Sequence, residues 1–276
     1  MNRAERRRQA KRKRSAPPSA SPLPTVAILK ATLQRLSSPA EIGHYLDTLI
    51  AQGLPPAAAE ELRVYGAEFH DATAILQSGT DRLSRLIANA QGWADTLIDQ
   101  SPQKNQRACH AGCAWCCYLP VVLVTTAEAL HLAGWLHNHC SDSELDALRH
   151  RLSTRLQRQQ APAEKDAPPL ACPLLRNNRC MAYEARPLKC RAWNSLRLAD
   201  CEQAYGHGSS ARQVRIDTSA FVMGNAVLSG LSDGVTQAGL DGSHHELCQA
   251  LDQALTQSDG AERWQQGEQV LSTQPR

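Results

Sequence analysis

The feature that most constrains this chain is the placement of its ten cysteines. Nine of them lie between Cys109 and Cys201, and four of these fall within the nine residues that end at Cys117. A disulfide-stabilised secreted domain usually distributes its cysteines through a short chain, whereas this chain has 276 residues and clusters them in its middle. We therefore interpret the clustered thiols as metal ligands rather than as disulfide partners.

The cysteines form two groups that together offer eight ligands. In the first group, Cys109-His-Ala-Gly-Cys113-Ala-Trp-Cys116-Cys117, the short spacings let a turn aim two sulfurs at one point, and Gly112 permits a left-handed backbone. The second group is more widely spaced and consists of Cys172, Cys180, Cys190 and Cys201. Eight thiolates suit two tetrahedral sites or two [4Fe–4S] clusters, and the spacing does not partition them. Because Cys116 and Cys117 are adjacent, we expect them to serve different metals or one of them to be a spectator.

Positive charge accompanies the second group. From Cys172 to Arg197 the chain has a local charge of +5, with Glu184 as the one acidic residue among six basic ones: Arg176, Arg179, Arg186, Lys189, Arg191 and Arg197. Arginines near a thiolate site offset its negative charge and donate N–H bonds to sulfur. We expect Arg186 and Arg191, which flank Cys190, to support the thiolates in this way. The alternative is an ordinary solvated surface or one that faces nucleic acid.

Taken in order, the two groups resemble a known family. The Cys109-x3-Cys113-x2-Cys116-Cys117 motif, the Cys172-Pro-Leu step and the later Tyr-Glu-x-Arg-Pro-x-x-Cys-Arg string resemble the YkgJ-like cysteine-cluster proteins, described as zinc- or iron-chelating. The likeness covers residues 105–205. It implies seven metal ligands, namely Cys109, Cys113, Cys116, Cys117, Cys172, Cys180 and Cys190, and it implies no particular reaction. Cys201 follows the motif and completes the set of eight.

These residues predict a metal-binding protein whose cysteines hold zinc or iron, the latter as an ion or a [4Fe–4S] cluster, in a structural or redox role. The alternative is an iron–sulfur-dependent enzyme that acts on a protein or a nucleic acid. The first three cysteines also match the spacing of radical-SAM enzymes. Those enzymes need an alternating β/α barrel, and residues 118–276 offer one short strand pattern among helices.

The remaining thiols and imidazoles have simpler interpretations. Cys140 follows two histidines at a helix end, where the helix dipole favours a positive charge. Cys248 shows the helical spacing of a core residue, so we predict a buried thiol. We expect His244 and His245 to lie at the surface, and His110 to point away from the cysteines. Aromatic residues beside the ligands are expected to pack over the sulfurs: Trp115, Tyr118, Tyr183 and Trp193.

Outside the cysteine groups the sequence predicts a mainly α fold. Residues 1–24 are expected to form a disordered basic tail and linker, residues 25–100 a helical region, and residues 101–276 an irregular, metal-organised cysteine domain. Capping boxes predict helix starts at Ser38, Thr125 and Ser141. The one β-branched run, at 118–124, predicts a short strand. Three C-terminal helices are expected near 218–232, 243–256 and 260–270.

Charge separates the tail from the rest of the chain. Residues 1–14 carry eight Arg and Lys against one Glu, a local +7, so the remaining residues sum to −4 against a whole-chain charge of +3. The tail could therefore make weak, nonspecific contact with nucleic acid, or simply be solvated. A Ser/Pro-rich stretch follows it in place of an apolar signal core, and no window is apolar enough to span a bilayer. We expect a cytoplasmic protein with no membrane contact.

Overall fold

The computed structural model describes residues 23–161, 169–205 and 214–272. These residues are mainly helical, which confirms the predicted fold class. They divide into two units, one ending at Arg63 and the other beginning at Val64. Within the described ranges, no helix combines the length and apolar character that a membrane span requires. The predicted tail lies outside the described residues except for Leu23 and Pro24.

The first unit contains α2 (Val26–Leu33), α3 (Pro39–Ala51) and the start of α4 (Pro56–Gln77). The predicted start of α3 is confirmed, since Ser38 Oγ accepts the Glu41 N–H at 3.2 Å. The apolar faces of α2 and α3 supply buried side chains at Leu29, Leu33, Ile42, Leu46 and Leu49.

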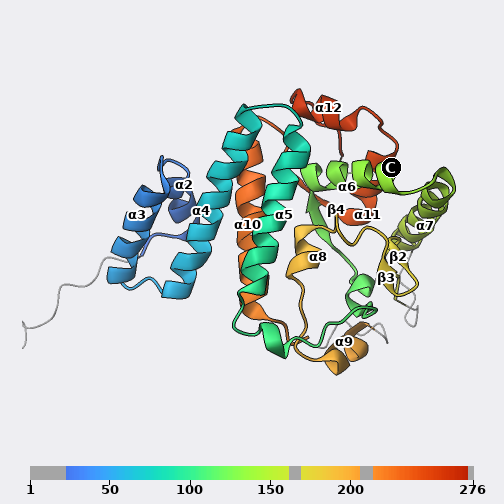
Figure 1. The fold of residues 1–276 in the computed structure, drawn as a ribbon, viewed down its shortest axis with the longest axis horizontal. Helices are drawn as coiled ribbons and strands as arrows, with labels where there is room; N and C mark the ends of the chain where they lie inside the picture. The colour runs from blue at the N-terminus through green and yellow to red at the C-terminus, as the bar shows by residue number, and fades with distance from the viewer. Residues whose placement is uncertain (1–22, 162–168, 206–213, 273–276) are drawn as a thin grey trace, which may run out of the picture. The chain divides into compact units, whose positions relative to one another are not determined.

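The second unit is built on a close pairing of α10 (Thr218–Gln237) with α4 and with α5 (Arg82–Asp99). Figure 1 shows α5 and α10 side by side, with α8 (Leu188–Ala192) beside them. Two glycines let α10 approach the backbone of α4. A Cβ on Gly230 would lie 2.6 Å from the Tyr65 carbonyl oxygen, and one on Gly234 would lie 2.7 Å from that of Phe69. Larger side chains at these two positions would force the helices apart.

The unit boundary differs from the sequence-based prediction. The sequence places α5 with the N-terminal helices and starts a new domain near residue 101. In the structure α5 packs on α10 and α8, so it belongs with the cysteine-bearing part of the chain. The physical reason is its apolar stripe, which includes Leu86, Ile87 and Ala90 and is buried by helices distant in sequence.

A small antiparallel ladder joins the middle of the chain to its C-terminal part. Strand β1 (Leu123–Thr125) pairs with β4 (His244–Glu246), and each strand leads directly into a helix, α6 (Thr126–His139) and α11 (Leu247–Leu255). The predicted strand thus exists but starts five residues later than expected, after a 3₁₀ helix η2 (Trp115–Tyr118).

The segment expected to begin a helix at residue 243 is instead a strand. Glu246 explains the change, because its carboxylate accepts the N–H groups of Cys248 and Gln249 and so caps α11 there. His245 is buried rather than exposed, which corrects the sequence-based expectation. Its Nε2 lies 2.9 Å from Thr126 Oγ1, which in turn donates to Asp241.

Shorter elements complete the second unit. The capping box at Ser141 starts α7 (Asp142–Gln160) as predicted. Strands β2 (Leu175–Arg176) and β3 (Arg179–Cys180) form a hairpin whose turn residues, both asparagines, have the positive φ angles that such turns require. The others are η1 (Lys104–Gln106), α9 (Leu198–Tyr205) and α12 (Gly260–Gln265).

The buried side chain of Glu68 on α4 allows a test of how α4 packs against α10. Its side chain is fully buried, and neither carboxylate oxygen has a hydrogen-bond partner among the described residues. Burial, followed by the charge of Asp71, raises the pKa of Glu68 well above its usual value. A raised folded-state pKa gives stability that is present below the unfolded pKa and is lost as the pH rises through the folded pKa.

We predict that Glu68→Gln raises the free energy of unfolding at pH 7, by about 1.4 kcal/mol for each pH unit between the unfolded and folded pKa values. The gain should vanish near pH 4, where wild-type Glu68 is protonated in both states. Urea unfolding across this pH range measures it, with Glu61→Gln, at an exposed position of the same helix, as the control. A pH-independent difference would contradict the account.

Candidate metal centre

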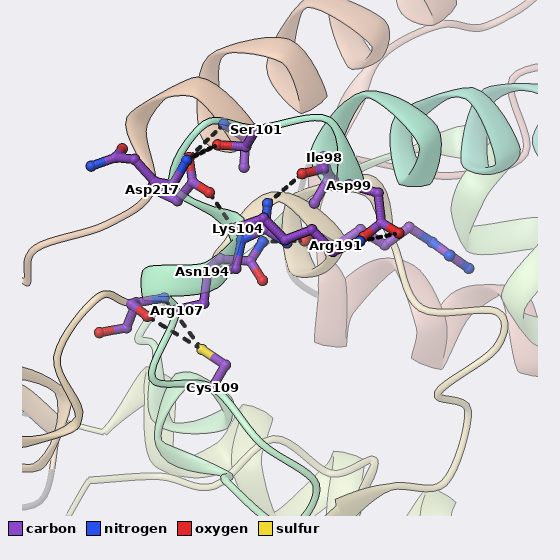
Figure 2. Close-up of polar contacts among 12 residues, drawn as sticks. Ile98, Asp99, Ser101, Lys104, Arg107, Cys109, Arg191, Asn194 and Asp217 are labelled. Carbon is purple, nitrogen blue, oxygen red and sulfur yellow. Dashed lines mark hydrogen bonds and ion pairs between the residues drawn. The ribbon is translucent and has the colours of Figure 1, made fainter.

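The first cysteine group is anchored to the N-terminus of α10 through Asp217. Arg107, two residues before Cys109, donates from Nε to Asp217 Oδ2 at 2.9 Å. Asp217 is buried and also accepts from Ser101 Oγ at 2.6 Å and from the Ala220 N–H at 3.0 Å. Figure 2 shows Arg107 between Asp217 and Cys109. One buried carboxylate therefore caps a helix and fixes the path of the chain into the cysteines.

Ser195 links Cys109 to a distant cysteine. The Ala108 N–H donates to the Ser195 carbonyl oxygen at 2.8 Å, and the Ser195 N–H donates to Cys109 Sγ at 3.3 Å. Burial raises the pKa of Cys201, and the nearby Ser195 side chain acts in the opposite direction. Cys109 and Cys201, one from each sequence group, thus share Ser195 as a neighbour.

The knuckle between Cys109 and Cys117 has the predicted turn. Gly112 adopts φ +87°, and the Cys113 N–H donates to the His110 carbonyl oxygen at 3.0 Å. The 3₁₀ helix η2 then carries the adjacent Cys116 and Cys117. Three of the four aromatic residues expected over the sulfurs pack against the buried cluster around Cys201, namely Trp115, Tyr118 and Trp193.

Tyr183 was expected to pack over the sulfurs, and the structure places it differently. Its side chain is 59% exposed, and the Arg186 guanidinium stacks over its ring at 4.0 Å from the centroid. The ring therefore holds an arginine in place and leaves much of its own surface open to solvent.

The second cysteine group folds back onto the first. The Cys172 N–H donates to the Cys117 carbonyl oxygen at 2.7 Å. Cys180 ends the β2–β3 hairpin, and Cys190 lies on α8. The structure thus brings together cysteines that are separated by more than fifty residues of sequence.

Glu128 positions the helix that carries Cys190. It is buried and closes the predicted capping box of α6, where its Oε2 accepts the Thr125 N–H at 2.9 Å. Its Oε1 accepts the Leu188 N–H of α8 at 2.8 Å. The capping motif is visible in the sequence, whereas its second bond, to a helix sixty residues later, has no local signal.

The thiols influence one another's ionisation. Burial raises the pKa of Cys172 to about 11, with a further contribution from Cys180. Burial also raises the pKa of Cys190 well above its usual value, and Cys172, Cys116 and Cys180 add to the effect. Cys116 is the exception, because a hydrogen bond from Cys117 lowers its pKa to about 7 and raises that of Cys117. Most of these thiols are therefore neutral at pH 7 in the metal-free chain.

The charges of three arginines act on the thiols. Burial raises the pKa of Cys109, Cys172 and Cys180, and the charges of Arg107, Arg155 and Arg186, respectively, act against it. Of the basic residues singled out in the sequence, Arg186 lies close enough to Cys180 for its charge to act on that thiol. Arg107 and Arg155 lie outside the basic stretch at 176–197, so sequence reasoning missed them.

Arg191 is placed against α5 instead. Its guanidinium donates to Asp95 Oδ2 at 2.5 Å, to Gln91 Oε1 at 3.0 Å and to the Glu184 carbonyl oxygen, while its Nε donates to the Arg186 carbonyl oxygen. These bonds commit every nitrogen of the side chain to α5 and to the carbonyl oxygens of residues 184 and 186. Arg186 and Arg191 both flank Cys190 in the sequence, but their side chains have different surroundings in the structure.

Three unpartnered donors belong to residues near the cysteines. Among the described residues, the buried atoms Arg155 Nε, Arg186 Nε and Trp193 Nε1 have no hydrogen-bond acceptor. The two arginines lie beside thiols, and Trp193 packs against the Cys201 cluster. A buried N–H without an acceptor costs about 1–3 kcal/mol. All three atoms are donors, so they suit an anionic acceptor such as a thiolate or sulfide.

The described residues contain no group of three or more His, Cys, Asp or Glu side chains that, as placed, could hold a metal ion. Cys140 is half-buried, and Cys248 is buried as predicted. Cys248 nevertheless lies close enough to Cys172 for the two to interact electrostatically. His110 is exposed, with its Nδ1 3.0 Å from the Ala111 carbonyl oxygen.

No family model, curated protein or solved structure matches the chain. The likeness to the YkgJ-like proteins consequently remains a prediction that rests on the cysteine motif.

Arg155 provides a test of how the cysteine segments are held. It is buried on α7 and donates from Nη2 to the carbonyl oxygens of Leu119, at 3.1 Å, and Pro120, at 3.3 Å, and from Nη1 to that of Leu170. These carbonyls stand just after Cys117 and just before Cys172. We predict that Arg155→Met lowers the free energy of unfolding by about 2–4 kcal/mol, because buried carbonyls lose charged donors.

The measurement is chemical unfolding together with hydrogen exchange. Amide protection should fall mainly at residues 116–120 and 170–174. Arg158→Met, at an exposed position of the same helix, is the control and should change the stability little. Equal effects of the two substitutions would contradict the role given to Arg155.

Proposed function

We propose that this protein binds zinc or iron through the eight cysteines of its two groups, as a structural or redox centre. The observation that carries the proposal is the presence of three unpartnered N–H donors beside interacting thiols. Arg155 and Arg186 have buried, unpartnered donors and lie close enough to Cys172 and Cys180 to influence their pKa values, and Trp193 has such a donor and packs against the cluster around Cys201. Thiolates bound to a cation would supply the missing acceptors.

The ionisation of the thiols supports the same proposal. Each thiolate formed in the metal-free chain raises the pKa of its neighbours, as Cys172, Cys116 and Cys180 do for Cys190. A zinc or iron cation reverses this effect, because it stabilises every thiolate that it contacts. The side chains do not converge in the metal-free arrangement, so binding would draw them together. Reduced thiols of this kind fit the reducing cytoplasm that we expect for the chain.

Zinc and iron are separated by a simple observation on anaerobically purified protein. An iron–sulfur cluster would make the protein brown, with absorbance at about 400 nm that dithionite bleaches. Zinc would leave it colourless, with metal in a stoichiometric amount. The cysteines and the N–H donors serve either centre, since both present anionic sulfur.

Substitution of single cysteines tests the proposed function. We predict that Cys116→Ser and Cys180→Ser each lower the bound metal by about half or more, because each removes a thiolate ligand. Cys248→Ala should leave the metal content unchanged, since Cys248 is a buried core thiol outside the eight. Elemental analysis of the purified variants, normalised to protein, is the measurement.

The Cys248 variant is a matched control because it also removes a buried sulfur and also costs packing. A fall in its stability with full metal content agrees with the proposal. The proposal fails if the wild type binds no metal, or if all three variants lose metal equally.

A further inference from the structure

We propose that the surface around the β2–β3 hairpin binds single-stranded nucleic acid, with phosphates held by arginines and one base stacked on Tyr183. The surface needs no bound metal, so it goes beyond the proposed function. Three features of the molecule point to it, namely the register of the hairpin, the exposure of one aromatic ring and a hollow between the hairpin and α7.

The hairpin places two arginines directly opposite each other. Arg176 of β2 pairs with Arg179 of β3, and both residues of the turn between them, Asn177 and Asn178, have positive φ angles. Like charges at directly opposite positions of an antiparallel pair are destabilising. An anion that both guanidinium groups contact would relieve this repulsion, and a phosphate group suits it because arginine binds phosphate with two parallel N–H bonds.

The chain itself compensates one of these two charges. Arg176 Nη1 donates to Glu144 Oε1 at 2.7 Å, at the start of α7. The side chain of Arg179 is exposed, and no carboxylate of the described residues pairs with it. Because side chains alternate along a strand, Arg179 projects from the face of the hairpin opposite to that of Cys180. A positive charge without a partner therefore stands on the face that the cysteine does not use.

Tyr183 adds an aromatic surface near these arginines. It follows Arg179 by four residues, and among the aromatic side chains that the structure describes it is the exposed one, at 59%. The Arg186 guanidinium lies over its ring at 4.0 Å from the centroid, which orients the ring before any ligand binds. An exposed, oriented ring suits the stacking of an unpaired base, and every base has a face that can stack.

A hollow of about 310 Å³ lies between the hairpin and the first turns of α7, which Figure 1 shows next to each other. Its lining residues are Ser143, Glu144, Ala147, Arg151, Arg176 and Met181. Arg151 is fixed there, because its Nε donates to the Pro173 carbonyl oxygen at 2.8 Å and its Nη2 lies 3.5 Å from Met181 Sδ. Met181 precedes Tyr183 by two residues, so their α-carbons are at most about 8 Å apart. A strand can therefore contact the arginines and the ring together.

The distribution of charge favours a nucleic acid as the partner. Residues 172–197 carry a local charge of +5, with Glu184 as their one acidic residue, whereas residues 15–276 together sum to −4. Arginines alone would suit any polyanion. The exposed ring adds a preference for a polyanion with planar groups, and a single strand presents its base faces whereas a duplex stacks them internally.

Binding of a fluorescent oligouridylate to the full chain, followed by anisotropy over a range of salt concentrations, tests the ring. Displacement by polyphosphate, a polyanion without bases, is measured alongside. Tyr183→Ala should weaken oligouridylate binding about fivefold or more and leave the polyphosphate affinity and the salt dependence unchanged, because it removes stacking but no charge. Tyr183→Phe keeps the ring and should bind within about twofold of the wild type.

The arginine contact is tested in the same assay. Arg179→Gln should weaken the binding of both ligands and reduce the slope of log affinity against log salt by about 0.7, the value for one phosphate contact on a single strand. Arg158→Gln is the matched control. It removes one exposed charge from α7 about 20 Å from Glu144, and should change the slope by less than half as much.

The proposal is overturned if the wild type does not bind oligouridylate, or if a duplex of the same length binds as tightly. Binding that neither Tyr183→Ala nor Arg179→Gln changes would place the contact on other basic residues, such as those of residues 1–14, and also overturns it. Equal losses of oligouridylate and polyphosphate binding in Tyr183→Ala would contradict stacking. Circular dichroism of each variant restricts these comparisons to folded proteins.

Discussion

Packing many thiols next to one another is the constraint on which this structure depends. Each thiolate makes the next one harder to form, which is why the pKa of Cys190 is raised by burial and then by Cys172, Cys116 and Cys180. The chain nevertheless gathers these residues from segments far apart in sequence. The thiols therefore stay mostly neutral in the metal-free chain, and a cation would be needed to hold several of them as thiolates. The nearby unpartnered N–H groups suit the anionic centre that we propose.

The helical scaffold holds the cysteine segments through buried polar residues rather than through the cysteines themselves. Asp217 ties the approach to Cys109 to the start of α10, and Glu128 ties α8 with Cys190 to the start of α6. Arg155 spans the segments after Cys117 and before Cys172. Glu128 and Arg155 each satisfy backbone groups of two segments, and Asp217 joins one backbone N–H to two side-chain donors. The cysteine region therefore has a defined path in the metal-free chain.

The sequence predicts those features that depend on local chemistry. The caps at Ser38, Thr125 and Ser141, the turn at Gly112 and the mainly α fold all follow from short-range patterns, and the structure has them. Features that depend on distant partners were missed or misplaced. The unit boundary lies before α5, because its apolar stripe fits helices far along the chain.

The same distinction holds within the candidate centre. The placement of Arg191 against Asp95 and of His245 against Thr126 depends on partners about a hundred residues away, and neither position carries a local signal. Ser195 and Arg155, which the sequence analysis did not single out, are polar residues among many. Clustered cysteines remain visible in any sequence, whereas the residues that arrange them are recognised only when the fold brings them together.

The central claim is that these thiols are arranged to receive a cation, and a titration of the reduced, metal-free protein with Zn²⁺ tests it most directly. At pH 7 most of the eight thiols are protonated, because burial and their neighbours raise the pKa values of residues such as Cys172 and Cys190. Binding must therefore release protons, about three to four for each four-thiol site, and should raise the melting temperature. Proton release that saturates at a defined metal ratio, together with a higher melting temperature, is the predicted result. Zinc that releases no protons and leaves the melting temperature unchanged would contradict the account.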